Sequence, residues 1–224
     1  MWGDLVGGST GKRVRITHSF ADRGDAWPSA MVAGASRQRN GADALCEGLI
    51  ADTLVATETG WRPVQELQPG DRIVTFDNGM RPLKAVHAAT LHTAAERAPR
   101  QVWPMQVPAG ALGNRTAMQL MPGQSVLIES DAAEMLYGDP FSMVPASVLD
   151  GHNGITRTAP QVETVVVTLE FDEDEVVYAN GMLLVHCAVS QPAAARPGDS
   201  AVLPYQRLTE AQARSLMKAM HQPF

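Results

Sequence analysis

The sequence predicts a mostly β protein with a compact fold. From Leu49 onward, short β-prone runs are separated by turn residues about every eight to twelve positions, which is typical of all-β domains. Hydrophobic residues make up 45% of the 224 residues, enough for the chain to build its own core. An apolar stripe at helical spacing near the C-terminus predicts one amphipathic helix. We therefore expect a β domain with short helices and a C-terminal amphipathic helix.

The expected strands share β-branched and aromatic residues and are bounded by turn residues. They cover residues 53–57, 71–76, 83–90, 117–121, 125–129, 164–171, 176–179 and 182–186. Asp77, Asn78 and Gly79 tolerate positive φ, so a tight hairpin turn is expected there. A brief helix is expected over residues 131–137 with Asp131 as its N-cap.

The chain divides into four parts by composition. Residues 1–44 are rich in Gly, Ser, Arg and Ala without a sustained period, which predicts a flexible arm. Residues 45–190 carry the β pattern, and residues 191–207 form a linker containing prolines. Residues 208–222 are expected to form a helix packed on the β domain.

The helix signal near the C-terminus has a start and an apolar face. Thr209 and Gln212 have the spacing of a capping box, so the helix should begin within two residues of Thr209. The apolar face recurs at i, i+3, i+4 and i+7, and its members are Ala213, Leu216, Met217 and Met220. We expect Leu216, Met217 and Met220 to be buried against the β domain.

Charge and hydropathy disfavour several classes of partner. The net charge of −6 gives no electrostatic reason to expect nucleic acid as a partner. No run approaches the ~20 apolar residues of a membrane span, and the N-terminus has no basic start followed by an apolar stretch. The sequence predicts a cytoplasmic protein, with export without a cleaved signal as the open alternative, and it leaves an unidentified protein partner open.

No cofactor or metal site is predicted. His87 and His92 are five positions apart, an odd offset that points them to opposite faces of one strand. The acidic run at residues 172–175 is interpreted as a solvated turn rather than a calcium site.

Three segments in order carry a resemblance to a known family. The first is the β-prone stretch 53–57 before Gly60; the second is residues 62–74, whose Pro63 to Val74 matches the pattern P-V-x-x-L-x-x-G-D-x-V with Ile73 at one hydrophobic position. The third is residues 179–186, Ala-Asn-Gly-Met-Leu-Leu-Val-His. Together they resemble the Hint family of hedgehog and intein autoprocessing domains, in its bacterial type. The likeness covers about 140 residues from Gly48 to Cys187 and implies the compact Hint-type β fold.

The resemblance implies a self-cleaving reaction with particular requirements. A cysteine or serine that opens the domain attacks the preceding peptide carbonyl, and a histidine protonates the departing amide nitrogen. In inteins a terminal Asn after a penultimate His then cyclises and releases the C-terminal side. In bacterial members the nucleophile precedes the threonine equivalent to Thr53 by five residues, which is Gly48 here. Cys46 lies two residues earlier and would serve only in a shifted register; otherwise it is a free thiol.

The other reactive positions also depart from the family pattern. In the run from Leu120 to Leu127 the histidine position is occupied by Gln124, whose amide cannot act as an acid or base. His186 matches the penultimate His, but Cys187 follows it directly and the cyclising Asn is absent. Either the Asn has been lost and Cys187 is the old downstream nucleophile, or the likeness is that of a strand ending in His.

Two hypotheses follow for the activity. The first is a Hint domain that has lost autoprocessing and persists as a folded or interaction module, with no assigned catalytic residue. The second is an active self-cleaving domain that uses Cys46 or Cys187, with His186 as a further candidate. In both cases residues near Gly48 and His186 should lie side by side, and Cys46 and Cys187 could approach each other. A chain carrying Gly48→Cys and Gln124→His together is expected to regain thioester formation.

Overall fold

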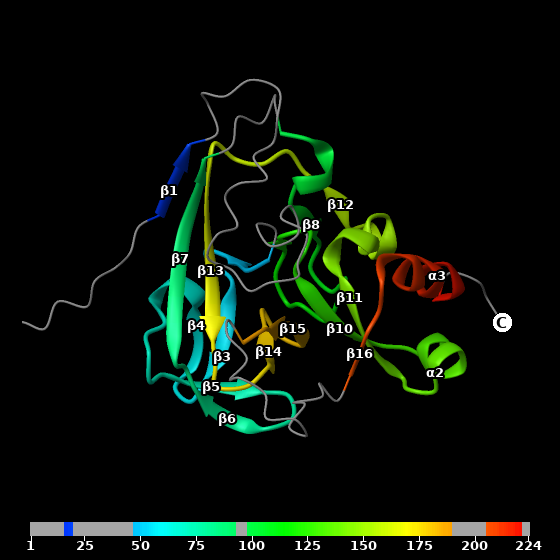
Figure 1. Cartoon of the computed structure of the whole chain (residues 1–224), viewed down its shortest axis with the longest axis horizontal. Helices are drawn as coiled ribbons and strands as arrows, with labels where there is room; N and C mark the ends of the chain where they lie inside the picture. Colours follow the sequence, from blue (N-terminus) through cyan, green and yellow to red (C-terminus); the bar gives the residue numbers. More distant parts are fainter. Residues whose placement is uncertain (1–15, 20–46, 93–97, 190–204, 221–224) are drawn as a thin grey trace, which may run out of the picture.

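The computed structural model describes residues 16–19, 47–92, 98–189 and 205–220 (Figure 1). These residues form two β sheets with two α-helices at one side, in agreement with the mostly β fold expected from the sequence. Each of the eight expected strands is present, with ends shifted by at most two residues. The local signals in the sequence therefore located the strands well.

The first sheet has the strand order β1-β7-β13-β2-β9-β8-β12. Its longest pair is β7 with β13, which are antiparallel from Glu163 opposite His92 to Glu170 opposite Ala85. The short strand β2 joins this pair to β9. The strands are β1 Ile16–Ser19, β2 Leu49–Ile50, β7 Ala85–His92, β8 Met105–Val107, β9 Met118–Leu120, β12 Thr156–Arg157 and β13 Glu163–Glu170.

The second sheet has the order β16-β11-β10-β15-β14-β3-β5-β6, with β4 paired to β3. The expected hairpin joins β5 to β6, and Gly79 has the positive φ of 66° that such a turn requires. The strands are β3 Leu54–Thr57, β4 Gly60–Pro63, β5 Arg72–Thr75, β6 Gly79–Pro82, β10 Ser125–Glu129, β11 Phe141–Pro145, β14 Glu175–Ala179, β15 Leu183–Cys187 and β16 Gln206–Arg207.

The helix α2 spans Asp131–Tyr137, but its N-cap differs from the expectation. Ser130 holds the extended cap conformation, and its side chain accepts a hydrogen bond from the N–H of Ala133. Asp131 is the first helical residue, where its charge still favours the positive end of the helix. Short 3-10 turns are η1 Val64–Glu66, η2 Arg100–Val102, η3 Ala146–Leu149 and η4 His152–Gly154.

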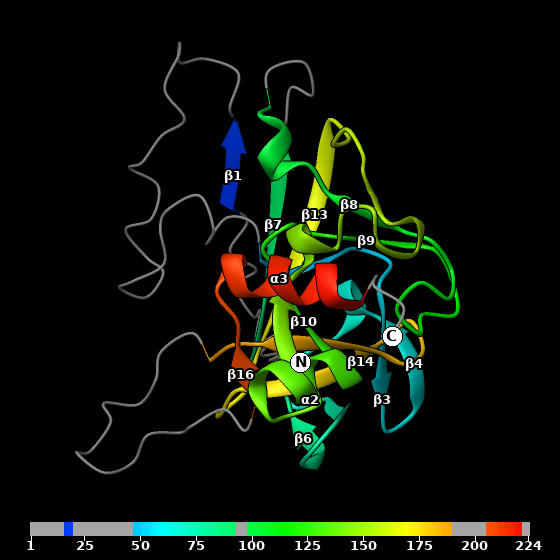
Figure 2. The ribbon, with the colours of Figure 1, turned by 90° about the vertical axis from the view of Figure 1, so that its right-hand side faces the viewer.

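The C-terminal helix α3 spans Glu210–Met220 and begins one residue after Thr209. The capping box is formed in both directions, because Thr209 N–H donates to Gln212 Oε1 and Gln212 N–H donates to Thr209 Oγ1. Leu216 and Met217 are buried, whereas Met220 is only half-buried. The helix packs on α2, η3 and β11, and Figure 2 shows it lying across that side of the molecule.

The N-terminal arm contains one described element. The strand β1 (Ile16–Ser19) pairs in parallel with β7, the outer strand of the long antiparallel pair. The arm was expected to be flexible throughout, and this strand is a difference from that expectation. An outer strand presents a row of main-chain N–H and C=O groups that a neighbouring segment can pair with. The rest of residues 1–44 lies outside the described residues.

The core lies between the two sheets and continues under the helices. Val126, Val177 and Val185 project into it from the central strands of the second sheet and are fully buried. The residues next to them in sequence point the other way, since side chains alternate along a strand. On that side Leu127, Met143 and Val176 form a smaller cluster that includes the rings of Phe76, Phe141 and Tyr205. The centre of the second sheet is therefore covered on both faces.

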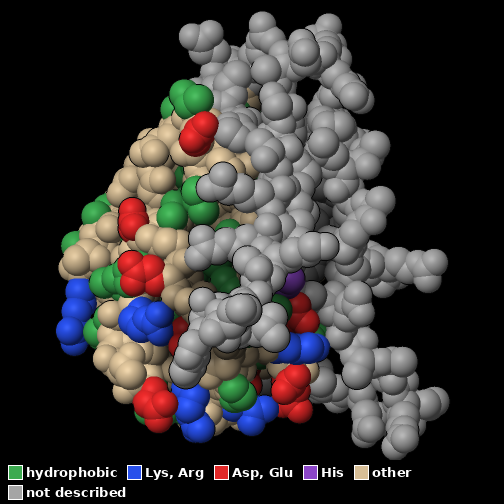
Figure 3. Space-filling model, turned by 90° about the vertical axis from the view of Figure 1, so that its left-hand side faces the viewer, with side chains coloured by type: hydrophobic (Ala, Val, Ile, Leu, Met, Phe, Trp, Pro, Cys, Tyr) green, Lys and Arg blue, Asp and Glu red, His purple; other side chains and the backbone are tan. Residues whose placement is uncertain are grey.

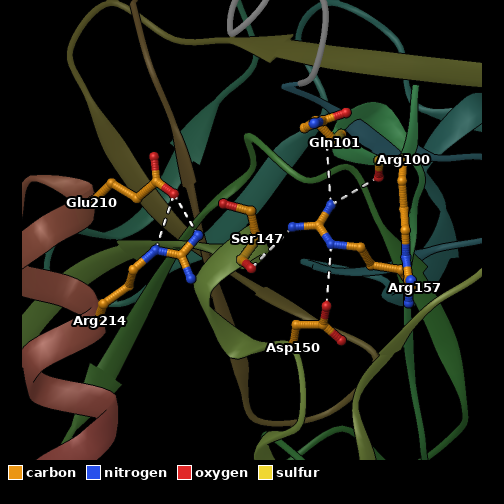
Figure 4. Close-up of polar contacts among 7 residues, drawn as sticks. All are labelled: Arg100, Gln101, Ser147, Asp150, Arg157, Glu210 and Arg214. Atoms are coloured by element: carbon orange, nitrogen blue, oxygen red, sulfur yellow. Dashed lines mark hydrogen bonds and ion pairs between the residues drawn. The ribbon is translucent and has the colours of Figure 1, made fainter. Parts of the chain in front are cut away.

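Arg157 fastens the short strand β12 to its surroundings (Figure 4). Its guanidinium donates to the main-chain oxygens of Arg100, Gln101 and Ser147, and it pairs with Asp150 at 3.2 Å. Arginine suits this position because its planar fork carries five donors. Figure 4 also shows the ion pair between Glu210 and Arg214 on α3, at 2.6 Å.

Two features of the exterior bear on partners. On the face shown in Figure 3, the visible Lys and Arg side chains are interspersed with Asp and Glu, and neither sign dominates the part of that face that is coloured by side-chain type. Neither α2 nor α3, the helices that the described ranges contain, is long and apolar enough to cross a membrane.

Candidate functional site

Gln124 joins the two ends of the β domain. Its side-chain Oε1 accepts a hydrogen bond from the N–H of Gly48 at 3.1 Å. Its Nε2 donates to the main-chain oxygen of His186 at 2.8 Å and to that of Ser125 at 3.0 Å. The residues near Gly48 and those near His186 therefore lie side by side, as the resemblance implied, although well over a hundred positions separate them in sequence.

A turn positions Gln124 for this role. The N–H of Gln124 donates to the oxygen of Met121, which closes a turn through Pro122 and Gly123 just before β10. Its own main-chain oxygen accepts from the N–H of Ala146, the first residue of η3, directly after β11. The side chain is 3% exposed, so its amide meets protein partners rather than water. An amide has no titratable proton near neutral pH, so Gln124 can hold hydrogen bonds but cannot supply a proton.

Gly48 occupies a position that a larger residue would strain. Its φ is +123°, a value that side-chain-bearing residues rarely adopt. A Cβ built there would lie 2.5 Å from Val166 Cγ1 and 3.3 Å from the main-chain oxygen of Val167. Regained thioester formation by Gly48→Cys with Gln124→His stays a prediction, and this geometry adds that the new cysteine would first require β13 or Val166 to shift.

His186 is held between two charged residues near the end of β15. Its Nδ1 lies 3.1 Å from Arg207 Nη2, and Arg207 belongs to β16 on the far side of residues 190–204. A guanidinium can only donate, so Nδ1 is the acceptor and the imidazole proton resides on Nε2. Nε2 lies 3.7 Å from Asp174 Oδ2. The His186 side chain is 2% exposed, and its acceptor nitrogen is already engaged by Arg207.

The acidic run at residues 172–175 forms the expected turn between β13 and β14, but half of it is not solvated. Glu175 is 2% exposed, pairs with Arg81 at 3.1 Å and accepts from Asn78. Asp174 is partly buried and accepts from the N–H of Val189 at 2.6 Å. The expectation of four carboxylates in water is therefore wrong for two of them. Partners distant in the sequence, above all the Arg81 guanidinium, compensate the burial of Glu175.

The environment of Asp174 stabilises its charged form. Burial alone would raise the pKa of its carboxyl group, but the imidazole N–H of His186 at 3.7 Å, the hydrogen bond from the N–H of Val189 and the charge of Arg207 outweigh burial. The pKa of Asp174 is therefore below its ordinary value of 3.8. This carboxylate remains a charged partner for His186 at neutral pH.

Cys187 points into the main core, opposite to His186 on the same strand. It is 8% exposed, and burial together with the charges of Glu175 and Asp174 raises its pKa to about 12. A thiol reacts as its thiolate, so this cysteine is poorly suited to be a nucleophile. Cys46 lies outside the described residues, and so does its approach to Cys187.

Asn180 links three segments of the fold through its side-chain amide. From the sequence it was named only as part of the motif at residues 179–186 and was given no role of its own. Its φ is +45°, and its Oδ1 accepts from the N–H of Leu54 at 2.6 Å. Its Nδ2 donates to Thr116 Oγ1 at 3.2 Å, so one side chain links the β14–β15 turn to β3 and to the segment before β9. Asparagine is favoured here because it tolerates positive φ and offers both a donor and an acceptor. The Asn-Gly pair at this turn was the signal that could have identified this role.

Arg207 is a site residue that sequence reasoning missed. It lies 21 positions after His186 and follows a proline-containing segment, so no spacing rule connects the two. Across the part of the chain that the structure describes, no group of three or more His, Cys, Asp or Glu side chains could hold a metal ion. Among the described residues, the site thus consists of a non-titratable amide, a glycine, a buried histidine held at Nδ1 by Arg207, and a buried thiol. Such an arrangement is suited to holding the two domain ends together.

Comparison with known proteins gives a family match. The family model described as "Hint domain" matches residues 47–184, more than half of the chain. Solved structures with a similar fold include the bacterial intein-like domain from Clostridium thermocellum, with 12% identity and a TM-score of 0.43 over 62% of this chain and 98% of that one. The gp41-1 intein gives 13% identity and a TM-score of 0.38 over 62% and 97% of the two chains. The MchDnaB-1 intein gives 13% and 0.37 over 62% and 98%.

No curated protein sequence matches the chain. The structural similarities are low, so the assignment rests on the family match, which covers the described β domain from the segment before β2 to β15. The chain belongs to the Hint domain family.

Proposed function

We propose that this protein is a Hint domain that has lost autoprocessing and is retained as a folded interaction module. In this proposal residues 45–190 form the module, and the helix within residues 208–222 packs on it as an integral part. The observation that carries the proposal is the contact of Gln124 with Gly48. Both partners of this contact are replacements, because Gly48 stands where the family carries its attacking nucleophile and Gln124 stands where it carries its proton-donating histidine.

The role of Gly48 supports the loss of the first step. Formation of a thioester or ester requires a sulfur or oxygen nucleophile at the start of the domain, and glycine has none. The positive φ and the 2.5 Å approach to Val166 also disfavour any side chain at this position.

The role of Gln124 supports the loss of proton transfer. General acid catalysis typically contributes about 10² to 10⁴ in rate, and an amide cannot provide it. All three hydrogen bonds of the Gln124 side chain are made within the protein and stabilise the ground state of the fold. In the proposal, the position that serves catalysis in the family has become a structural link.

The state of His186 and Cys187 supports the loss of C-terminal cleavage. The acceptor nitrogen of His186 is engaged by Arg207, and the thiol of Cys187 is buried with a pKa of about 12. The buried thiol is not prepared to react near neutral pH, and His186 would have to give up its contact with Arg207 to accept a proton at Nδ1.

The test is the intact mass of the purified full-length chain, followed over several days at neutral pH with and without dithiothreitol or hydroxylamine. The expected result is a single species at the full mass of 24.0 kDa. Cleavage before Cys46 would instead release residues 1–45, one fifth of the 224 residues.

Matched variants distinguish the rival hypothesis of an active self-cleaving domain. Cys46→Ala and Cys187→Ala should leave the mass spectrum unchanged if autoprocessing is lost. Thiol-dependent cleavage that Cys46→Ala abolishes would identify Cys46 as the nucleophile and overturn the proposal. Cleavage that only Cys187→Ala abolishes would overturn it equally and would place the chemistry at the end of β15.

A further inference from the structure

A cavity of about 370 Å³ opens where the central strand of the first sheet stops after two residues. β2 (Leu49–Ile50) separates β13 from β9 and pairs with both of them. The cavity is lined by residues 50–53, by residues 117–119 next to or in β9, by Gln161, by residues 163–165 at the start of β13, and by Asn180. It therefore lies in the line of β2, between the two strands that β2 would continue to bridge.

A turn removes the chain from the sheet at this point. The N–H of Thr53 donates to the oxygen of Ile50, and Asp52 has a positive φ of 70°. The turn is clamped by Gln65, which donates to Asp52 Oδ1 at 2.7 Å and accepts from the N–H of Asp52 at 2.8 Å. The chain is thereby directed away from β13 and into β3. The cavity is a consequence of this clamped turn.

At the end of the ladder between β2 and β13, only one of the two main-chain hydrogen bonds expected between Ala51 and Val165 is formed. The N–H of Ala51 donates to the oxygen of Val165 at 2.9 Å. In an antiparallel ladder the N–H and C=O of one residue point to the same side, so the N–H of Val165 also faces the cavity. Among the main-chain bonds of the described residues, the return bond from Val165 N–H to Ala51 O is absent. Val165 thus presents a main-chain donor to the cavity.

The dimensions suit one extended strand. Neighbouring strands lie about 4.8 Å apart, so the two strands flanking β2 are separated by about 9.6 Å, the space of a single strand. The lining residues 163–165 and 117–119 are three on each side, and three residues of strand extend about 10 Å. A peptide that enters in the direction of β2 would be antiparallel to both neighbours, the arrangement that β2 itself has.

The charge of the rim favours a cationic ligand. The charged residues that line the cavity are Asp52 and Glu163, both exposed, and the described lining contains no Lys, Arg or His. We propose that this cavity binds a short extended peptide carrying a lysine or arginine, which completes the sheet between β13 and β9 by strand addition. This inference goes beyond the proposed function and does not depend on whether self-cleavage is lost.

The test is titration of the full-length protein with an N-acetylated, C-amidated pentapeptide of sequence Thr-Lys-Val-Lys-Thr, followed by amide chemical shifts. The expected result is saturable binding with shifts in residues 117–119 and 163–165. A second peptide has proline in place of the central valine. It should bind about tenfold more weakly, because proline has no main-chain N–H to donate to a neighbouring strand.

A pair of exposed alanines provides matched variants. Ala117→Trp adds bulk at the cavity rim, whereas Ala211→Trp adds the same bulk on α3, outside the cavity lining. Ala117→Trp should weaken peptide binding about tenfold relative to Ala211→Trp.

Equal binding by these two variants, equal binding of the two peptides, or shifts confined to other segments would overturn the proposal. So would the absence of saturable binding to the unmodified protein. None of these results concerns self-cleavage, which the intact mass reports separately.

Discussion

Replacement of Gln124 by methionine tests whether this residue is the structural link between the two domain ends. Methionine has a similar length and is apolar, so the change removes three hydrogen bonds while largely keeping the volume. Leaving the N–H of Gly48 without its partner costs about 1–3 kcal/mol, and each of the other two bonds contributes about 0.5–1.5 kcal/mol. Gln124→Met should therefore lower the free energy of unfolding by about 2–6 kcal/mol.

The measurement is urea denaturation of the unmodified protein and of Gln124→Met, monitored by circular dichroism. With m of about 1–3 kcal/mol/M, the loss should move the midpoint by about 0.7 M or more without a change in m. Gln161→Met is the control, because Gln161 is exposed and its change should stay within about 0.5 kcal/mol. A change at Gln124 as small as that at Gln161 would refute the role assigned to this side chain.

Three further predictions follow from the same region. Gly48→Ala should lower the free energy of unfolding by about 1–3 kcal/mol because of the positive φ alone. Val166→Ala should relieve the contact between the new Cβ and the Val166 side chain, so the two changes should couple favourably in a double-mutant cycle. A cycle without favourable coupling would contradict this steric explanation. In a Cys46→Ala background, Cys187 should react with a disulfide reagent roughly 10³-fold more slowly in the native protein than in urea, since its pKa is about 12; similar rates would show an accessible thiolate. Because the folded-state pKa of Asp174 lies below 3.8, its contribution to stability is present above that pH and is lost as the pH falls through the folded-state pKa. Asp174→Asn should therefore flatten the acid limb of a plot of urea midpoint against pH. An unchanged acid limb would rule out this contribution.

Eight of the strands and the C-terminal helix could be predicted because their signals are local. The alternation of residues 164–171, the turn at Asp77 to Gly79 and the capping box of Thr209 with Gln212 each lie within a few positions of the chain. Strand periodicity, turn chemistry and helix capping can each be recognised from such neighbours. The wrong N-cap expected for α2, Asp131 instead of Ser130, is an error of one residue. Both residue types are good N-caps, and only the backbone geometry selects between them.

The burial of the acidic run could not be predicted in this way. Glu175 is buried because register places Arg81 and Asn78 beside it, 94 and 97 positions away in sequence. Four successive acids carry no sign of such partners, so a solvated turn was the reasonable expectation. The contact of His186 with Arg207 was hidden for the same reason.

The sequence by itself determined the family, the mostly β fold, and the presence of glycine at position 48 and an amide at position 124. These depend on residue identity and short-range pattern, which the chain carries wherever it is folded. Only the tertiary structure decided that Gln124 links Gly48 to His186, across 76 and 62 positions, and that Cys187 faces the core. It also decided that β2 leaves its sheet at Asp52 and opens a cavity between β13 and β9. The physical reason is that such contacts are set by strand register and by the packing of two sheets, which no local segment of the sequence encodes.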